Sequence, residues 1–293
     1  MRYIYDVMGI EFIIESPFEI KMKPESVPFL RRTEEEPVKE SYHINFQPVE
    51  EIRITEKAGQ WRSNEFYAEH EEGRNVYFAA LRDRMPFACV QTRWDTPNEM
   101  IIQYRPGEED EMEYSYNIVN LMSNESLLKD HHGFMLHSSF IKWKEKGILF
   151  SAPSGTGKST QADLWVKYEG ADILNGDKSG VRKQNGIWRA YGLPNAGSSE
   201  IYRNECADLK MVVVLRQAKE NKIRRMESKE ALFCLYQECV MHRWDRQFTE
   251  KILDTLKEFV EEVPVYLLEC LPDQGAVELV KKTILEEEGG GLI

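Results

Sequence analysis

One stretch decides the fold: residues 150–160 read F-S-A-P-S-G-T-G-K-S-T. Residues 152–159 follow the phosphate-binding loop pattern G-x-x-x-x-G-K-[S/T], with Ala152 in place of the first glycine. Small residues matter in such a loop because the backbone must curl until several N–H groups point inward at phosphate oxygens. The pattern predicts that Lys158 reaches the β- and γ-phosphates and that the Ser159 hydroxyl binds Mg²⁺.

The segments on either side of this loop support the match. Residues 147–150 read as a short buried strand, and residues 159–165 open a helix with apolar residues at helical spacing. A strand–loop–helix frame places the positive end of the helix behind bound phosphates. The alternative is a chance glycine-rich turn before a helix, which the two flanks disfavour. We therefore predict an ATP site made by Ser154, Gly155, Thr156, Gly157, Lys158, Ser159 and Thr160.

Composition limits the class of protein. The 293 residues are enough for two domains, and 42% hydrophobic with 30% charged residues is typical of a soluble globular chain. The net charge of −12 argues against a nucleic-acid partner, which needs clustered Lys and Arg. No secretory signal is evident, and no uncharged apolar run approaches the roughly 20 residues that span a bilayer. Five cysteines without C-x-x-C spacing suit a reducing compartment, so we expect a cytoplasmic protein without a membrane partner.

The chain divides into two halves of different character. Residues 1–125 hold short β-like runs bounded by Pro, Gly, Asn or acidic residues, the pattern of a meandering antiparallel sheet. Because no catalytic constellation is found there, this half is interpreted as a β-rich accessory or substrate-binding domain. Residues 126–288 alternate strands with helices, including a buried strand at 210–215 and helices at 231–242 and 248–260, which predicts an α/β domain. Residues 289–293 are expected to be a flexible tail.

Two candidate residues flank the loop along the chain. Asp177 ends a short apolar strand, where nucleotide-binding folds place the acid that manages Mg²⁺ or the nucleophile. The nearby Asp172 is expected to cap the strand or to face solvent. His137 is one of three histidines in residues 131–137, but no acid or thiol lies at ligand spacing, so an ordinary structural histidine stays the alternative.

Two further candidates lie downstream. Glu200 follows a loop of small and polar residues, which by itself reads equally well as a surface connection. Arg203 could clamp a phosphate group, although an ordinary surface arginine is the simpler interpretation.

Together these residues resemble the catalytic domain of the HPr kinase/phosphorylase family, whose phosphate-loop fold is shared with ATP-dependent phosphoenolpyruvate carboxykinase. That family has a histidine fifteen positions before the first loop residue, as His137 stands before Ala152. Its strand after the loop ends in two adjacent aspartates, where this chain has Gly176-Asp177. A downstream glutamate helps to hold the metal in the family, and Glu200 is the matching position. The resemblance covers about residues 130–285 and is closer to divergent HPr-kinase-like relatives, some of which phosphorylate serine on ribosomally made peptides.

The resemblance implies an ATP- and Mg²⁺-dependent kinase that transfers the γ-phosphate to a hydroxyl of a protein, peptide or small molecule. Serine is the first acceptor to consider. His137, Lys158 and Asp177 are the implied catalytic residues, with Asp177 accepting the proton of the attacking hydroxyl or orienting it. Ser159, Asp177 and Glu200 are the implied metal ligands. Two alternatives stay open: a carboxykinase-like enzyme of small metabolites, and a nucleotide-dependent regulatory switch with little catalysis, which Gly176 favours. Assembly into a homo-oligomer is also open.

Overall fold

The computed structural model is mixed α/β with two sheets. It describes residues 1–31, 40–52, 58–62, 65–68, 74–82, 85–93, 95–113, 115–122, 124–194, 197–243 and 245–289. Its internal contacts divide the chain into two compact units: Met1–Leu127 with His242–Gln247, and Leu128–Met241 with Phe248–Ile293. The expected tail, residues 289–293, lies outside the described residues apart from Gly289. Within the described ranges, no helix combines the length and the apolar character needed to cross a membrane.

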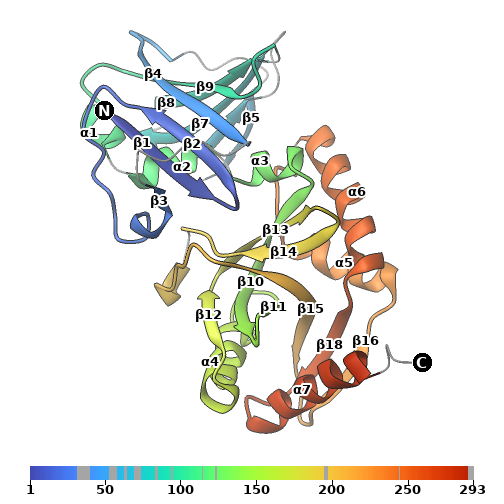
Figure 1. The fold of residues 1–293 in the computed structure, drawn as a ribbon. Helices are drawn as coiled ribbons and strands as arrows, with labels where there is room; N and C mark the ends of the chain where they lie inside the picture. The colour runs from blue at the N-terminus through green and yellow to red at the C-terminus, as the bar shows by residue number, and fades with distance from the viewer. Residues whose placement is uncertain are drawn as a thin grey trace. The chain divides into compact units, whose positions relative to one another are not determined.

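The first unit is built on one mixed sheet (Figure 1). Its strands run in the order β3-β1-β2-β4-β9-β8-β7-β6-β5. Their bounds are β1 (Arg2–Val7), β2 (Ile10–Glu15), β3 (Leu30–Arg31), β4 (Ser41–Pro48), β5 (Ala58–Arg62), β6 (Glu65–Ala68), β7 (Arg74–Arg82), β8 (Met85–Arg93) and β9 (Glu99–Tyr104). The helical segments are η1 (Val27–Phe29), α1 (Glu109–Met112), α2 (Ser115–Met122) and α3 (Asn124–Asp130).

The expected antiparallel meander is wrong at the centre of this sheet. Strand β4 pairs in parallel with both β2 and β9, and only the strands around it are antiparallel. Parallel neighbours need a long crossover, which residues 16–40 and 49–98 provide. Alternating residues reveal which face of a strand is buried and turn residues reveal where it ends, but neither reveals its neighbour. Phe12 and Tyr42 illustrate the pairing: they are register partners whose rings stack with centroids 5.8 Å apart.

The second unit contains the remaining elements (Figure 1). The strands are β10 (Gly133–Trp143), β11 (Lys146–Ser151), β12 (Asp172–Asn175), β13 (Lys178–Gln184), β14 (Ile187–Tyr191), β15 (Cys206–Gln217), β16 (Lys222–Arg225), β17 (Cys239–Val240) and β18 (Val265–Cys270). The helical segments are α4 (Lys158–Glu169), η2 (Gly197–Ser199), α5 (Ser228–Glu238), α6 (Arg246–Glu262) and α7 (Gln274–Gly289). Strand β11 pairs with β10 and with β15, and these two are joined again through β13 and β14, so the pairings form a closed circuit.

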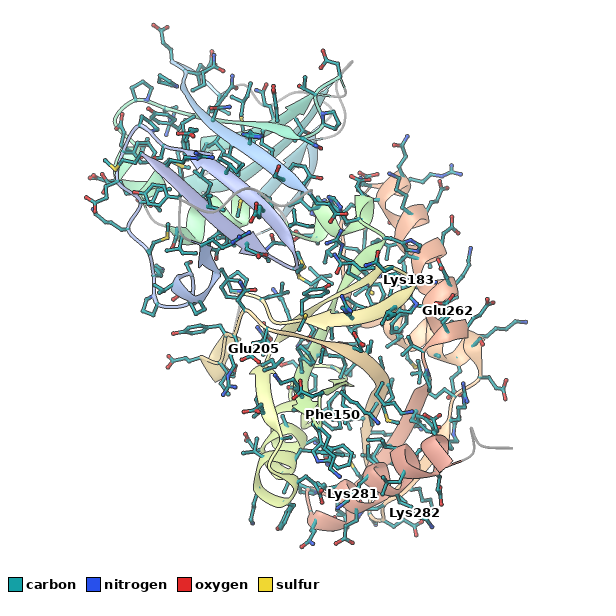
Figure 2. All side chains as sticks on the ribbon, in the orientation of Figure 1. Phe150, Lys183, Glu205, Glu262, Lys281 and Lys282 are labelled. Carbon is teal, nitrogen blue, oxygen red and sulfur yellow. The ribbon has the colours of Figure 1, made fainter. Side chains whose placement is uncertain are left out.

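Helices cover both faces of β15 and β18. Alternate residues of β15 enter opposite core clusters, because successive side chains of a strand point to opposite faces. Met211 packs in the cluster that contains Trp165 of α4 and Phe150 of β11, which is labelled in Figure 2. Its neighbour Val212 packs in the cluster that contains Leu256 of α6. The predicted buried strand at 210–215 is therefore confirmed, and it places the carboxyl end of β15 beside the phosphate-loop sequence.

Ion pairs hold α6 against the β13–β14 hairpin. Lys183 Nζ lies 2.6 Å from Glu258 Oε1 and 2.7 Å from Glu262 Oε2, and Lys183 and Glu262 are labelled in Figure 2. The indole N–H of Trp188 also donates to Glu262, at 2.7 Å. These contacts join α6 to both strands of the hairpin.

Candidate functional site

The phosphate-loop sequence lies in the predicted strand–loop–helix frame. Strand β11 ends at Ser151, and α4 begins at Lys158. Gly155 and Gly157 have φ angles of 78° and 119°, which residues with a side chain rarely adopt. A Cβ built at either position would meet no atom within 4 Å. Glycine is therefore needed here for backbone conformation, and the space beyond both Cα atoms is open to a ligand. Gly157 is the N-cap of α4 and forms no side-chain cap, so the first-turn amides are left to a ligand or to water.

Lys158 is buried inside this loop. Its side chain is 7% exposed, and Nζ donates to the carbonyl oxygen of Ala152 at 2.8 Å and to that of Pro153 at 3.4 Å. Burial lowers the pKa of the Lys158 ammonium, and the negative charges of Glu238 and Asp177 oppose that shift. The loop lysine therefore stands in the electrostatic field of two carboxylates.

Asp177 and His137 come together through strand pairing. His137 on β10 is the register partner of Lys178 on β13, and Asp177 immediately precedes that strand. His137 Nε2 lies 3.7 Å from Asp177 Oδ1. Fully buried Asn175 shapes the turn, because its Oδ1 accepts the backbone N–H of Asp177 at 2.9 Å and that of Lys178 at 3.0 Å. The structure thus brings two of the sequence-predicted residues into contact.

Glu238 joins this cluster, although nothing in the sequence pointed to it. His137 Nδ1 lies 3.0 Å from Glu238 Oε2. The helix predicted over 231–242 is wrong at its end: α5 stops at Glu238, because Cys239 and Val240 pair with β10 as strand β17. This long-range pairing brings Glu238 to His137, and it carries no local signal in the sequence.

Gly176, which precedes Asp177, lies against Ser199 of the turn η2. A Cβ on Gly176 would lie 2.3 Å from Ser199 Oγ and 2.4 Å from Ser199 Cβ. The turn η2 also packs on the acid itself, since a Cβ on Gly197 would lie 2.8 Å from Asp177 Cβ. Ser199 therefore takes up the volume that a side chain at position 176 would need.

The residues predicted to hold Mg²⁺ are not gathered into a cage of side chains. Ser159 is exposed at the start of α4, and Glu200 is exposed with φ 52° after η2. Among the described residues, no group of three or more His, Cys, Asp or Glu side chains is arranged to hold a metal ion.

The remaining candidate residues, His132, Arg203 and Asp172, form ion pairs away from His137. His132 pairs with Glu258 at 2.6 Å, so it does not join His137 in a cluster. Arg203 Nη1 lies 3.2 Å from Asp172 Oδ1, and both side chains are about half exposed. This pair supports the surface interpretation of Arg203 and Asp172.

A hollow of about 510 Å³ lies on the other side of the phosphate loop. It is lined by residues 153–156 of the loop, by residues 214–217 at the carboxyl end of β15, by Leu267 of β18 and by Cys234 of α5. Gln217 at the end of β15 donates from Nε2 to the carbonyl oxygens of Gly155 at 3.4 Å and Thr156 at 3.3 Å. Strand β11 lies between β10 and β15, and neither His137 nor Asp177 lines this hollow.

Residues 107–275 match the protein-family model described as "SynChlorMet cassette protein ScmC". The match covers more than half of the chain. The chain belongs to the ScmC family. The matched range includes the phosphate loop, His137, Asp177, Glu200 and Glu238, and it leaves residues 1–106 outside.

Other comparisons add little to this ScmC-family assignment. A search of curated proteins finds no match. Among solved structures, the HPr(Ser) kinase/phosphatase from Coxiella burnetii is similar at 12% identity over 53% of this chain and 98% of that chain, with a TM-score of 0.33. The case for a function of this family member therefore depends on its own site.

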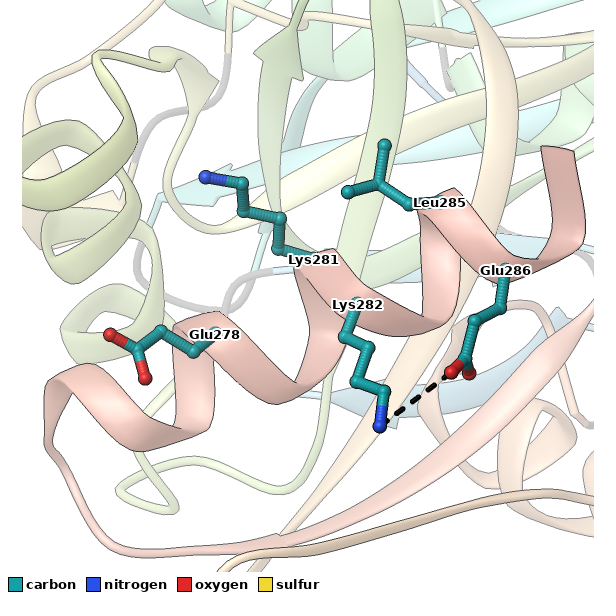
Figure 3. A pocket seen from close by; sticks show the side chains of 5 residues that line it. All are labelled: Glu278, Lys281, Lys282, Leu285 and Glu286. Carbon is teal, nitrogen blue, oxygen red and sulfur yellow. Dashed lines mark ion pairs between the residues drawn. The ribbon is translucent and has the colours of Figure 1, made fainter. Parts of the chain in front are cut away.

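A second hollow lies along α7, and its lining differs from that of the hollow beside β15 (Figure 3). Its volume is about 420 Å³, and its lining is Glu278, Lys281, Lys282, Leu285 and Glu286. These side chains come from a single helix, and its two lysines are paired: Lys282 with Glu286 at 3.6 Å and Lys281 with Glu169 at 2.9 Å. This groove on α7 has no phosphate-loop backbone, whereas the hollow beside β15 is partly walled by one.

Proposed function

We propose that this chain is an ATP-dependent phosphotransferase that moves the γ-phosphoryl group of ATP to a hydroxyl, in the first place that of serine, on a protein, peptide or small molecule. One observation carries the proposal: Lys158 of the phosphate loop lies in the field of Asp177 and Glu238, with His137 between these two carboxylates. A phosphate-binding cradle next to a potential proton acceptor is what phosphoryl transfer requires, because this reaction depends on positioning and charge neutralisation. The resemblance to HPr kinases supports a hydroxyl acceptor.

Each residue then has a role. The loop amides of residues 154–160 and the Lys158 ammonium bind the β- and γ-phosphates. ATP is the phosphoryl donor, and its Mg²⁺ would be held by Ser159 and Asp177, with Glu200 as an outer ligand, and would neutralise part of the phosphate charge. Asp177 orients the attacking hydroxyl and accepts its proton. The hollow beside β15 takes the nucleoside part of the donor.

The test measures binding and transfer separately. We expect calorimetry to show MgATP binding that Lys158→Ala weakens by more than about tenfold, since a charge-assisted phosphate contact is lost. Lys167→Ala is the matched control, because Lys167 lies in the last turn of the same helix and stacks on Tyr168. Transfer is measured with γ-labelled ATP and an array of serine-containing peptides. Equal MgATP binding by Lys158→Ala and the unmodified chain would refute the site.

A second candidate function is a nucleotide-dependent switch with little catalysis. The contact of Ser199 with Gly176 favours it, because the turn then carries one carboxylate where the resembling kinases have two. A switch would bind MgATP with the same dependence on Lys158, yet would neither label any peptide in the array nor release phosphate. Labelling of one peptide that disappears in Asp177→Asn would exclude the switch.

A further inference from the structure

The ring of His137 is held between carboxylates from two different elements. Glu238 Oε2 lies 3.0 Å from Nδ1, and Asp177 Oδ1 lies 3.7 Å from Nε2. An ionised carboxylate can only accept a hydrogen bond, so the contact with Glu238 places a proton on Nδ1. That contact also fixes the plane of the ring and directs Nε2 toward Asp177.

Glu238 lies at a position where a carboxylate needs compensating contacts. It is the last residue of α5, where the negative end of the helix dipole destabilises a carboxylate, and the last turn holds no basic residue. Its side chain is also only 16% exposed, which adds a desolvation cost. The contact with His137 and the charge of the nearby Lys158 ammonium offset these effects.

Strand β17 accounts for the arrangement. Its two residues pair with Met135 and Leu136 of β10, so the chain leaves α5 directly opposite His137. A strand of two residues adds few hydrogen bonds to the sheet, but it sets the distance between Glu238 and the ring.

We propose that Glu238 is a positioning residue for phosphoryl transfer, which rests on the function proposed above: it holds His137 so that Nε2 stays beside Asp177. In the reaction, the acceptor oxygen forms a bond to the γ-phosphorus, and the bond to the β–γ bridging oxygen breaks, leaving its electron pair on ADP. The hydroxyl proton passes to Asp177. Glu238 touches none of the reacting atoms and acts through the imidazole.

The activity test uses phosphate release from MgATP, with water as the acceptor. Glu238→Ala should lower kcat about tenfold to a hundredfold, the range found for carboxylates that orient a histidine in metal sites, with KM for ATP unchanged. Glu238→Gln should keep most of the rate, because its side-chain carbonyl still accepts from Nδ1–H. Glu230→Ala is the matched control on α5, since Glu230 pairs with Arg224 at 2.6 Å.

A double-mutant cycle separates positioning from a general structural effect. If Glu238 acts through His137, Glu238→Ala should have no effect on kcat in a His137→Ala background. A further loss in that background, or an unchanged kcat in Glu238→Ala alone, would overturn the proposal.

A readout without turnover keeps this inference distinct from the proposed function. Nitrogen-15 NMR of the histidine rings, at a pH where they are neutral, should show His137 protonated at Nδ1, and Glu238→Ala should remove that preference. His137→Ala identifies the resonances. If the unmodified chain binds MgATP but never transfers phosphate, the proposed function fails and Glu238 positions no reaction; if Nδ1 stays protonated in Glu238→Ala, the positioning role fails by itself.

Discussion

The two sides of the phosphate loop differ in kind. On the β10 side, His137 links the carboxylates of Asp177 and Glu238 at 3.7 and 3.0 Å. On the β15 side, the hollow is walled by loop backbone and is lined by Arg216, Gln217 and the apolar side chain of Leu267. The carboxylates thus lie where bonds would be made and broken, and the hollow offers loop backbone, an amide and a cation. Substitutions on the two sides should therefore affect different kinetic constants.

The largest effect is expected from removing the Asp177 carboxylate on the β10 side. Asp177→Asn should lower kcat about 10²- to 10⁴-fold, the contribution of a positioned general base. The affinity for metal-free ATP should not be weakened, because Asp177 lies away from the hollow beside β15. Rapid-quench transfer assays and calorimetry without Mg²⁺ provide the two measurements.

The control for that change is Asp172→Asn at the start of β12. Asp172 pairs with Arg203 at a half-exposed position, so its loss should leave kcat unchanged. An Asp177→Asn variant with the unmodified rate would remove the β10 side from the mechanism.

A smaller effect is expected from substituting Gly176, the residue before Asp177. Gly176→Ala should destabilise the fold by about 1–3 kcal/mol, because the new methyl group meets Ser199 and the backbone there is not in the left-handed region. Urea unfolding measures the change. In a Ser199→Gly background the cost should fall below about 1 kcal/mol, since contacting residues couple. If the cost is the same in both backgrounds, Ser199 is not the reason for glycine at this position.

The smallest effect is expected on the β15 side. Gln217→Ala removes two long hydrogen bonds to the loop carbonyls, so ATP affinity should fall only about two- to tenfold, with kcat unchanged. Gln217→Glu should bind ATP more weakly than Gln217→Ala, because a carboxylate cannot donate to these carbonyls and repels phosphate. A fall in kcat with unchanged affinity would contradict the division between the two sides, and calorimetry with steady-state assays distinguishes the cases.

The sequence predicted what depends on short-range geometry. The loop frame around Lys158, the helix that follows it and the strand ending near Asp177 could all be read because glycine conformations and apolar periods are local properties. The family resemblance implied that His137 and Asp177 are both catalytic residues, and their side chains lie 3.7 Å apart.

What the sequence did not predict depends on pairing between distant segments. The parallel neighbours of β4 were missed because side-chain alternation specifies a face and no partner. Glu238 was missed because the strand that places it has two residues and no periodicity. The contact between Gly176 and Ser199 was also hidden, so the departure from the two-aspartate pattern could be seen but not explained.

Strand β10 is bonded along both edges where it carries His137. Register pairs with β13 end at His137, pairs with β11 begin at Ser138, and β17 pairs just before them. The Ser138 N–H also donates to the Asp177 carbonyl, and the Ser151 hydroxyl donates to that of His137, both at 3.0 Å. Hydrogen bonds along both edges therefore hold the main chain that carries the imidazole. The ring sits on a paired backbone, and its orientation depends on rotation about the side-chain bonds of His137.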